Sequence, residues 1–321
     1  MHSDVDWLHT PYDLAGKRVW VAGADGMVGG ALIRRLRREE CELITVPKRE
    51  LDLRNQQYTH DWIKANKPDV VILAAARVGG IAANDKYRAD FLYDNLMIEG
   101  NVIHGSYLSG VEKLLFLGSS CIYPKKCSQP IGESALLTGA LEPTNESYAV
   151  AKIAGMKMCE AYRHQYGCDF ISAMPCNLYG VGDRYDVFNS HVIPALIMKM
   201  HEAKLNGLSE VNLWGSGKPR REFLYVDDLA DGLIFLIKNY SGAMHVNIGA
   251  GEDISISSVS NMIAELVGFN GQIIFDSSMP DGVYQKLMDC TLLRQTGWRH
   301  SIDLADGLKL AYKDYLGRMI T

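Results

Sequence analysis

Residues 18–29 of this 321-residue chain read RVWVAGADGMVG, a short β-branched run followed by a GxxGxxG turn. A helical pattern with one apolar face follows from Met27 to Arg38. Glycines in such a turn remove the Cβ atoms that would hold the backbone away from a phosphate, and the start of the helix supplies free N–H donors. The turn therefore predicts a dinucleotide site, although a Gly-rich turn without a ligand can have the same letters.

Strand-like runs alternate with helical patterns along the first half of the chain, as expected for βαβ units and a parallel sheet. The predicted strands are Arg18–Ala22, Leu43–Val46, Asp69–Leu73, Lys113–Leu117 and Phe170–Met174. Right-handed crossovers place helices on both faces of such a sheet. We therefore expect an α/β, Rossmann-type fold with a doubly wound parallel sheet and ligands at the carboxyl ends of the strands.

The pattern changes after about Asn177 to irregular segments rich in Gly and Pro, and one further helix-strand unit follows at Val226–Gly249. Residues 17–176 and 226–249 are predicted to form the cofactor-binding domain. Residues 177–225 and 250–321 are predicted to form a smaller, discontinuous α/β domain that binds the substrate. Residues 1–16 are interpreted as a short extension.

Composition excludes several classes of protein. With 33 Lys+Arg against 38 Asp+Glu, the net charge of -5 provides no field for nucleic acid. The seven cysteines are scattered without CxxC or His-paired metal spacing, which predicts reduced thiols, a cytoplasmic location and no metal site. No apolar run approaches the roughly 20 residues that span a bilayer, so no membrane association is expected.

The turn after the second predicted strand concerns the choice of cofactor. NAD sites usually have an acidic residue about 20 residues beyond the glycine loop, whereas this chain has Lys48 and Arg49 there. The two cations favour the 2′-phosphate of NADP. A solvated basic turn is the alternative, Glu50 could pair with either cation, and Asp25 places an unfavourable negative charge in the loop.

Tyr148 and Lys152 stand at i and i+4 of a helical pattern, so their side chains share one face. An ammonium group close to a phenol favours the phenolate and makes the tyrosine usable as an acid or base nearer neutral pH. Ser119, at the end of the fourth predicted strand, would hydrogen-bond the same substrate oxygen. A YxxxK pair alone is common by chance, but its order after the glycine turn and Ser119 indicates a reductase centre.

Together these motifs resemble the extended short-chain dehydrogenase/reductase family and, within it, the GDP-4-keto-6-deoxymannose 3,5-epimerase/4-reductases. The similarity extends from about residue 18 to near the C-terminus. The strings that carry it are residues 23–29, 76–81, 115–124, 141–146, 148–152, 177–180, 189–196, 214–217 and 221–228. The resemblance implies NADPH as cofactor, a GDP-sugar as substrate and a homodimer built on two helices, residues 89–108 and 148–166.

The resemblance also implies catalytic roles. Cys121 would be the base and His191 the acid in epimerisation at the carbons next to the C4 ketone, while Ser119 and Tyr148 hold the C4 oxygen. Tyr148 would then donate a proton as hydride reaches C4, with Lys152 holding the nicotinamide ribose. Without the resemblance, a small buried thiol and a surface or helix-capping histidine would be the ordinary interpretations of Cys121 and His191.

The implied binding residues form two sets. The cofactor set is Gly23, Ala24, Asp25, Gly26, Met27, Val28, Gly29, Lys48, Ala74, Ala75, Leu117, Gly118, Ser119, Tyr148, Lys152, Pro175, Asn177, Leu178 and His191. The substrate set is Ser119, Cys121, Asn177, His191, Lys199, Trp214, Arg221 and Lys286. Arg and Lys suit a pyrophosphate, and Trp214 offers a flat ring surface. A solvated Lys199 and a Trp214 in the core are the alternatives.

The chain departs from the family pattern at Ala24-Asp25, where a His-Arg pair is usual, and at Lys48, where an arginine is usual. Related enzymes that act on colitose-type or heptose-type GDP-4-keto sugars share much of the motif set, and some only reduce. A nucleotide-sugar 4-epimerase or dehydratase that recycles NAD is a further alternative, which Cys121 and His191 disfavour. A non-catalytic NADP(H)-binding sensor is another, which intact Tyr148 and Lys152 disfavour.

Overall fold

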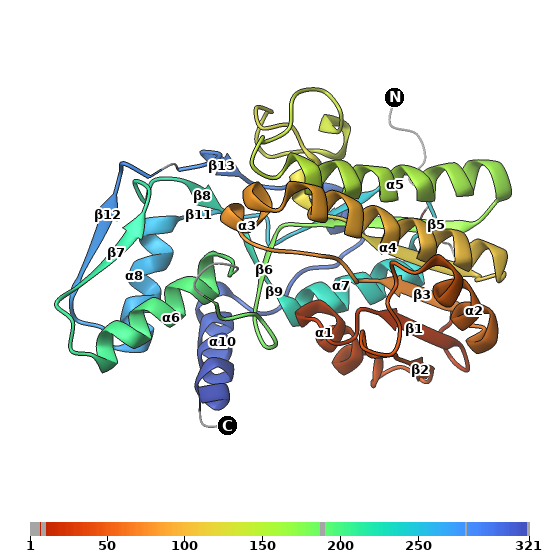
Figure 1. Ribbon diagram of the computed structural model, residues 1–321, viewed down its shortest axis with the longest axis horizontal. Helices are drawn as coiled ribbons and strands as arrows, with labels where there is room; N and C mark the ends of the chain where they lie inside the picture. Colours follow the sequence, from red (N-terminus) through yellow and green to blue (C-terminus); the bar gives the residue numbers. More distant parts are fainter. Residues whose placement is uncertain (1–6, 8–10, 187–189, 280, 320–321) are drawn as a thin grey trace.

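The computed structural model describes residue 7 and residues 11–186, 190–279 and 281–319. Asn189, which begins one of the motif strings, and most of the predicted N-terminal extension lie outside the described residues. Figure 1 shows a larger body that carries the parallel sheet and a smaller body beside it.

Six parallel strands form the central sheet, in the order β10-β5-β4-β3-β1-β2. The strands are β1 (Arg18–Ala22), β2 (Glu42–Ile44), β3 (Val70–Leu73), β4 (Lys113–Leu117), β5 (Asp169–Pro175) and β10 (Val246–Ile248). The chain steps from β1 to one side for β2 and then to the other side for β3. The carboxyl ends of β1 and β3 therefore flank the point where ligands bind in doubly wound folds.

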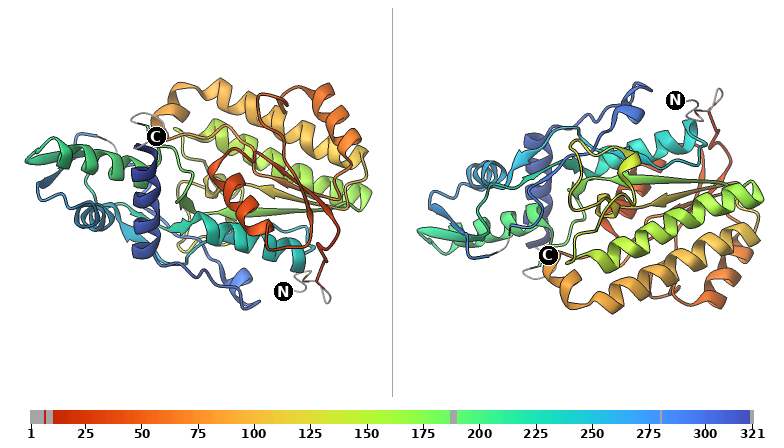
Figure 2. Two further views of the ribbon diagram at one scale, coloured as in Figure 1. Left: turned by 90° about the horizontal axis from the view of Figure 1, so that it is seen from below. Right: turned by 90° about the horizontal axis from the view of Figure 1, so that it is seen from above.

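Helices cover both faces of this sheet (Figure 2). One face carries α2 (Gln56–Asn66), α4 (Arg88–Leu108) and α5 (Glu146–Tyr166), with α3 (Ile81–Lys86) leading into α4. The other face carries α1 (Met27–Leu36) and α7 (Val226–Asn239), which are joined by the ion pairs Arg34–Asp227 and Arg35–Asp231. The predicted α/β doubly wound fold is confirmed.

The predicted strands and helices differ from the observed ones mainly at their ends. The strand predicted at Leu43–Val46 is observed as Glu42–Ile44, at the edge of the sheet. Pro47 has no N–H to donate and restricts the backbone of the residue before it, which explains why pairing does not extend to Val46. The helix predicted from Met27 to Arg38 ends at Leu36.

The smaller body has its own hydrophobic core. Its main elements are α6 (Val192–Leu205), β7 (Glu210–Trp214), α8 (Ile256–Val267), β12 (Gln272–Asp276) and α10 (Leu304–Met319). Short strands join it to the larger body: β6 (Asn177–Tyr179) pairs with β9 (Phe223–Tyr225), and β8 (Arg220–Arg221) lies between β11 (Ile254–Ser255) and β13 (Gln285–Lys286).

Strand β9 contributes to both cores. Phe223 and Tyr225 belong to the smaller core, whereas Leu224 belongs to the larger one, because successive side chains of a strand point to opposite faces. The segment around α9 (Thr291–Arg294) also packs on the larger core through Met288, Cys290, Leu293 and Trp298. The predicted domain boundaries, which assign this segment to the substrate domain, stay a prediction.

Within the described residues, no helix combines the length and the apolar character that crossing a bilayer requires.

Candidate active site

The glycine loop lies against the end of β3. Gly23 has a φ of +96°, and a Cβ on it would come within 2.7 Å of the Ala75 backbone nitrogen. A Cβ on Gly29 would overlap the carbonyl oxygen of Gly23. The loop is thus closed by backbone-to-backbone contact, and a side chain at either glycine would force it apart. The first turn of α1 has no side-chain cap, which leaves its N–H groups available for an anion.

Asp25 and Lys48 meet beside this loop. The carboxylate of Asp25 accepts a hydrogen bond from the Lys48 backbone N–H at 3.1 Å, which ties the turn after β2 to the glycine loop. Both residues are exposed, and the structure records no ion pair between their side chains. The Asp25 carboxylate is therefore bonded to the backbone of the turn, and Lys48 is an exposed residue of that turn.

Ser119 and Tyr148 come together at the carboxyl end of β4. The Ser119 hydroxyl accepts a hydrogen bond from the Cys121 backbone N–H at 3.2 Å, at the start of the short 3-10 helix Ser120–Ile122. Burial raises the pKa of the Tyr148 phenol above its ordinary value, the charges of Cys121 and Glu99 raise it further, and a hydrogen bond with Ser119 opposes the rise. The phenol is thus held in its protonated form.

Lys152 is deeply buried, with 2% of its side chain exposed. Its ammonium donates a hydrogen bond to the Leu117 carbonyl oxygen at 3.0 Å and lies 5.9 Å from the centre of the Tyr148 ring. It also forms an ion pair of 3.1 Å with Glu99 of α4. The i, i+4 spacing on α5 therefore places this ammonium beside the phenol, as the sequence predicts.

Cys121 has two polar neighbours. The side-chain amide of Asn145, immediately before α5, donates a hydrogen bond to the Cys121 sulfur at 3.3 Å. Arg221 on β8 interacts electrostatically with Cys121, although burial, as the larger effect, lowers the pKa of its guanidinium. The Cys121 sulfur thus has an N–H donor and a guanidinium in its surroundings.

His191 lies at the start of α6 with an extended backbone. Its side chain is exposed to solvent, but desolvation by the protein around it lowers the pKa of the imidazole. Within the described residues, the structure gives it no hydrogen bond to Ser119, Cys121 or Tyr148. Recorded interactions thus link four of the five predicted catalytic residues, and the place of His191 in the site stays a prediction.

The predicted substrate residues gather on two surfaces. Arg221 and Lys286 are register partners on the parallel strands β8 and β13. The ammonium of Lys199 lies 6.0 Å from the ring centre of Trp214, whose surface is 65% exposed. A core position for Trp214 is thereby ruled out.

Asn177 on β6 donates its amide hydrogen to the Glu222 carbonyl oxygen at 2.8 Å. Of the remaining cofactor candidates, Ala74 follows β3 and contacts the glycine loop, Gly118 follows β4, Pro175 ends β5 and Leu178 lies in β6. All these positions are on the carboxyl side of the sheet.

Two polar neighbours of the site were missed in the sequence analysis, Glu99 and Asn145. Glu99 occupies the buried side of a helix, four residues after the buried Asn95 and eight after the buried Phe91. A carboxylate in such a stripe needs a partner, which is a signal that sequence reasoning could have used.

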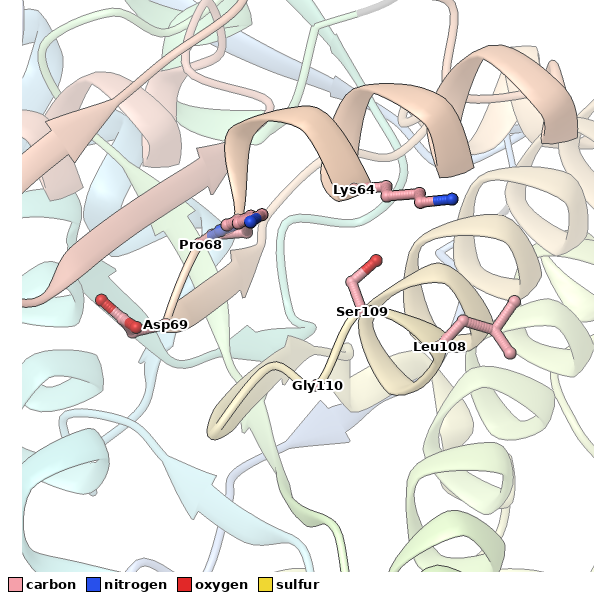
Figure 3. Close-up of a pocket in the computed structure, with 7 residues that line it drawn as sticks. Lys64, Pro68, Asp69, Leu108, Ser109 and Gly110 are labelled. Atoms are coloured by element: carbon pink, nitrogen blue, oxygen red, sulfur yellow. The ribbon is translucent and has the colours of Figure 1, made fainter.

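A pocket on the opposite edge of the sheet is separate from this site. It lies between the carboxyl ends of α2 and α4, at the amino ends of β3 and β4 (Figure 3). Its lining residues are Lys64, Lys67, Pro68, Asp69, Leu108, Ser109 and Gly110. Within the part of the chain that the structure describes, no group of three or more His, Cys, Asp or Glu side chains is arranged to hold a metal ion.

The sheet order, the glycine loop at the switch point and the side chains at the carboxyl ends of β3 and β4 define the class: a Rossmann-type α/β protein built to bind a dinucleotide. The model of the NAD dependent epimerase/dehydratase family matches residues 19–249, and the chain belongs to that family.

Three relatives are similar over almost their whole length. A GDP-L-fucose synthase from Sinorhizobium fredii is 55% identical, over 96% of this chain and 98% of the relative. The structure of a GDP-L-fucose synthetase from Naegleria fowleri bound to NADP is 28% identical, with a TM-score of 0.91 over 98% of this chain and 99% of that one. A GDP-6-OMe-4-keto-L-xylo-heptose reductase from Campylobacter jejuni is 39% identical, with a TM-score of 0.88 over 94% of this chain and 98% of that one.

Proposed function

We propose that this chain is an NADP-dependent oxidoreductase with epimerase activity, which converts GDP-4-keto-6-deoxy-D-mannose to GDP-L-fucose by 3,5-epimerisation and then 4-keto reduction. The observation that carries the proposal is the position of Cys121 beside Ser119 and Tyr148. A simple 4-reductase needs only the hydroxyl groups that hold and protonate the C4 oxygen, whereas a thiol beside them provides a base for the neighbouring carbons. The 55% identical relative supports the same reaction.

The residues present fit NADP. The glycine loop closes tightly because Gly23 and Gly29 have no Cβ, and the uncapped start of α1 suits a pyrophosphate. Lys48 provides a cation for the 2′-phosphate, and Lys152 would hold the nicotinamide ribose. NADPH, when bound, supplies the hydride for the reduction.

The epimerisation uses groups of the chain itself. Ser119 and Tyr148 hold the C4 oxygen and stabilise the negative charge that develops there when a neighbouring carbon loses its proton. The Cys121 thiolate takes that proton, and His191 returns one to the opposite face of the same carbon. Burial lowers the pKa of His191, so the protonated form that donates is a minor but more strongly acidic form at neutral pH.

The reduction uses the same oxygen. As hydride adds to C4, Tyr148 donates its phenolic proton to the C4 oxygen, and the phenolate left behind recovers a proton from solvent. The raised pKa of Tyr148 keeps the phenol protonated at neutral pH, whereas the sequence predicts a pKa nearer neutral. Arg221 and Lys286 would bind the GDP diphosphate, and Trp214 and Lys199 would pack on the nucleotide sugar.

An isotope experiment tests the proposal. The protein is incubated with GDP-4-keto-6-deoxymannose and NADPH in D₂O, and the product is analysed for deuterium. We expect NADPH to be consumed stoichiometrically and deuterium to appear at C3 and C5. Cys121→Ser should abolish the exchange and spare some reduction, whereas Cys127→Ser, a change at a partly exposed thiol bonded to the Pro124 carbonyl, should leave both intact.

Two outcomes would contradict the proposal. Reduction without deuterium at C3 or C5 would show that the protein is a C4 reductase without epimerase activity. Turnover of the sugar without net loss of NADPH would indicate a 4-epimerase or dehydratase that recycles its cofactor.

A second candidate, reduction of a GDP-4-keto-heptose, is favoured by the 39% identity to the heptose reductase. Parallel assays with a GDP-4-keto-heptose and with GDP-4-keto-6-deoxymannose would separate the two, because the preferred substrate has the higher kcat/KM.

The location and assembly of the protein belong to the proposal as well. A cytoplasmic enzyme fits the reduced cysteines. A homodimer through α4 and α5 fits the exposed Tyr93, Leu108, Val150 and Tyr166 on these two helices. Light scattering coupled to gel filtration gives the mass of the particle in solution, and a monomer would contradict the proposed assembly.

A further inference from the structure

Glu99 and Lys152 form a buried ion pair between the neighbouring helices α4 and α5. The oxygen-to-nitrogen distance is 3.1 Å, and each side chain has only 2% of its surface exposed. Taking a carboxylate out of water is unfavourable unless a partner offsets the lost hydration. Burial of the Glu99 carboxylate is therefore energetically unfavourable by itself, and it occurs directly beside the proposed reaction centre.

The packing around the carboxylate leaves room for it. A Cβ on Gly155, three residues after Lys152 on the same face of α5, would come within 2.6 Å of the Glu99 Oε2 atom and of the Phe116 ring. The glycine thus allows the two helices to approach while α4 carries an ionisable group between them. The ammonium of Lys152 also lies 4.8 Å from the centre of the Phe116 ring.

Three groups hold the ammonium of Lys152. The Leu117 carbonyl accepts its hydrogen bond at 3.0 Å, the Glu99 carboxylate balances its charge, and the Phe116 ring lies close to it. The Tyr148 ring centre is 5.9 Å away. A long lysine side chain has many rotamers, so these contacts restrict it to one position relative to the phenol.

The charge of Glu99 also acts on the phenol. Burial is the largest cause of the raised pKa of Tyr148, and Cys121 and Glu99 raise it further. Lys152 would act in the opposite direction, because a cation favours the phenolate. Burial raises the pKa of Glu99 itself to about 6, and Lys152 opposes that rise, so the carboxylate is ionised at neutral pH.

Among the described residues, the ionisable groups that interact with Glu99 lie on α5: Lys152, Tyr148 and Cys159. Strand β4 contributes the Phe116 ring and the Leu117 carbonyl, and β5 contributes Ser172, which bonds Cys159.

We propose that Glu99 is a positioning residue for the reduction step: its carboxylate fixes the Lys152 ammonium beside Tyr148, whose phenol donates to the substrate oxygen. This inference rests on the proposed function. The geometry assigns to Glu99 an action through Lys152, without contact to the substrate.

The test is Glu99→Gln, which keeps the volume and removes the charge. We expect kcat for NADPH oxidation to fall by about tenfold to a hundredfold at neutral pH, because the ammonium is no longer fixed. We also expect the alkaline limb of the pH profile of kcat to move down by about one unit, because Lys152 without its counter-charge favours the phenolate. Deuterium exchange at C3 and C5, measured without NADPH, should fall less than the reduction does.

Two further variants complete the test. Glu160→Gln removes a carboxylate that pairs with an exposed lysine, Lys157, on α5, and should leave both rate and pH profile unchanged. Glu99→Asp keeps the charge but is one methylene shorter, so kcat should fall while the alkaline limb stays near that of the wild type. Circular dichroism shows whether Glu99→Gln folds. If it does not fold, Glu99→Asp decides the question, because the proposal predicts that its kcat falls while the alkaline limb of its pH profile stays in place.

An unshifted alkaline limb in a folded Glu99→Gln protein with a normal kcat would overturn the inference. A fall in kcat and in exchange by the same factor, with the limb unmoved, would also overturn it and indicate a purely structural role. If the wild-type protein does not oxidise NADPH with the sugar, the proposed function fails instead. The role of Glu99 is then tested by an alkaline titration of tyrosine, followed by the ultraviolet absorbance of tyrosinate. Tyr148→Phe identifies the contribution of Tyr148. If that titration is the same in Glu99→Gln as in the wild type, the inference is overturned.

Discussion

The side-chain amide of Asn145 donates a hydrogen bond to the sulfur of Cys121 across 3.3 Å, and so connects the residue before α5 to the end of β4. Such a bond strengthens when the acceptor becomes charged. Asn145 therefore holds the sulfur of Cys121 in one orientation.

The first prediction concerns this bond. Asn145→Ala should lower the rate of deuterium exchange at C3 and C5 by about tenfold to a hundredfold, because the sulfur loses its only side-chain donor among the described residues. Reduction of an already epimerised substrate should fall much less. The exchange is followed by NMR in D₂O.

Asn239→Ala is the matched control, since among the described residues that amide bonds the Phe235 carbonyl within α7. Equal losses of exchange and of reduction in Asn145→Ala would contradict a specific role beside Cys121.

A second prediction compares two adjacent glycines. A methyl group on Gly29 would overlap the Gly23 carbonyl, so Gly29→Ala should open the glycine loop and weaken NADPH binding at least about a hundredfold. Gly30→Ala places its methyl 3.6 Å from Arg34, an ordinary contact, and should bind NADPH normally. It should also be slightly more stable, because alanine favours a helix over glycine by up to about 1 kcal/mol. Cofactor binding is measured by the quenching of protein fluorescence, and equal binding by the two variants would refute the proposed loop.

The β-strands and the site could be predicted from sequence because each depends on local signals. Apolar runs such as Lys113–Leu117 contain enough information to locate a buried strand, and all strands of a parallel sheet present their carboxyl ends at one edge. Motifs that follow separate strands, such as Gly23 and Ser119, are therefore expected to meet there. The family resemblance added Cys121 and His191, which chemistry alone did not single out.

Other features depend on tertiary packing and could not be obtained in this way. The pairing of Arg221 with Lys286 joins two strands of only two residues each, far apart in the chain. Such strands have no periodicity to detect. The ion pair of Glu99 with Lys152 requires the relative rotation of α4 and α5, and Gly155 looks like an ordinary helix glycine until Glu99 is placed opposite it.

A third prediction concerns the preference for NADPH. Lys48→Ala should raise the KM for NADPH by about tenfold and leave the KM for NADH nearly unchanged, because only NADPH has the 2′-phosphate. The Asp25 bond to the Lys48 backbone does not involve the lost side chain, so the loop should keep its shape. Lys64→Ala, in the pocket at the opposite edge of the sheet, is the control. A parallel rise in both KM values would show that Lys48 does not distinguish the two cofactors.

A fourth prediction concerns Glu222, which is fully buried and joins two segments of chain. Its carboxylate accepts the backbone N–H groups of Gly251 at 2.5 Å and Met288 at 2.9 Å. Burial raises the pKa of Glu222 to about 7 from an ordinary value of 4.5, and the two hydrogen bonds oppose the rise. Between these pH values the folded protein retains a proton that the unfolded chain has released, so this group makes the free energy of unfolding fall as pH increases.

The stability that Glu222 contributes is therefore present in full below about pH 4.5 and is lost as the pH rises through about 7. Glu222→Gln cannot titrate, so its free energy of unfolding should fall less steeply than that of the wild type between these values. Urea unfolding at several pH values measures the difference. Glu252→Gln, a change at an exposed neighbour, should follow the wild type. Parallel curves for the wild type and Glu222→Gln would show that the carboxylate keeps an ordinary pKa in the folded protein, held down by its two backbone donors.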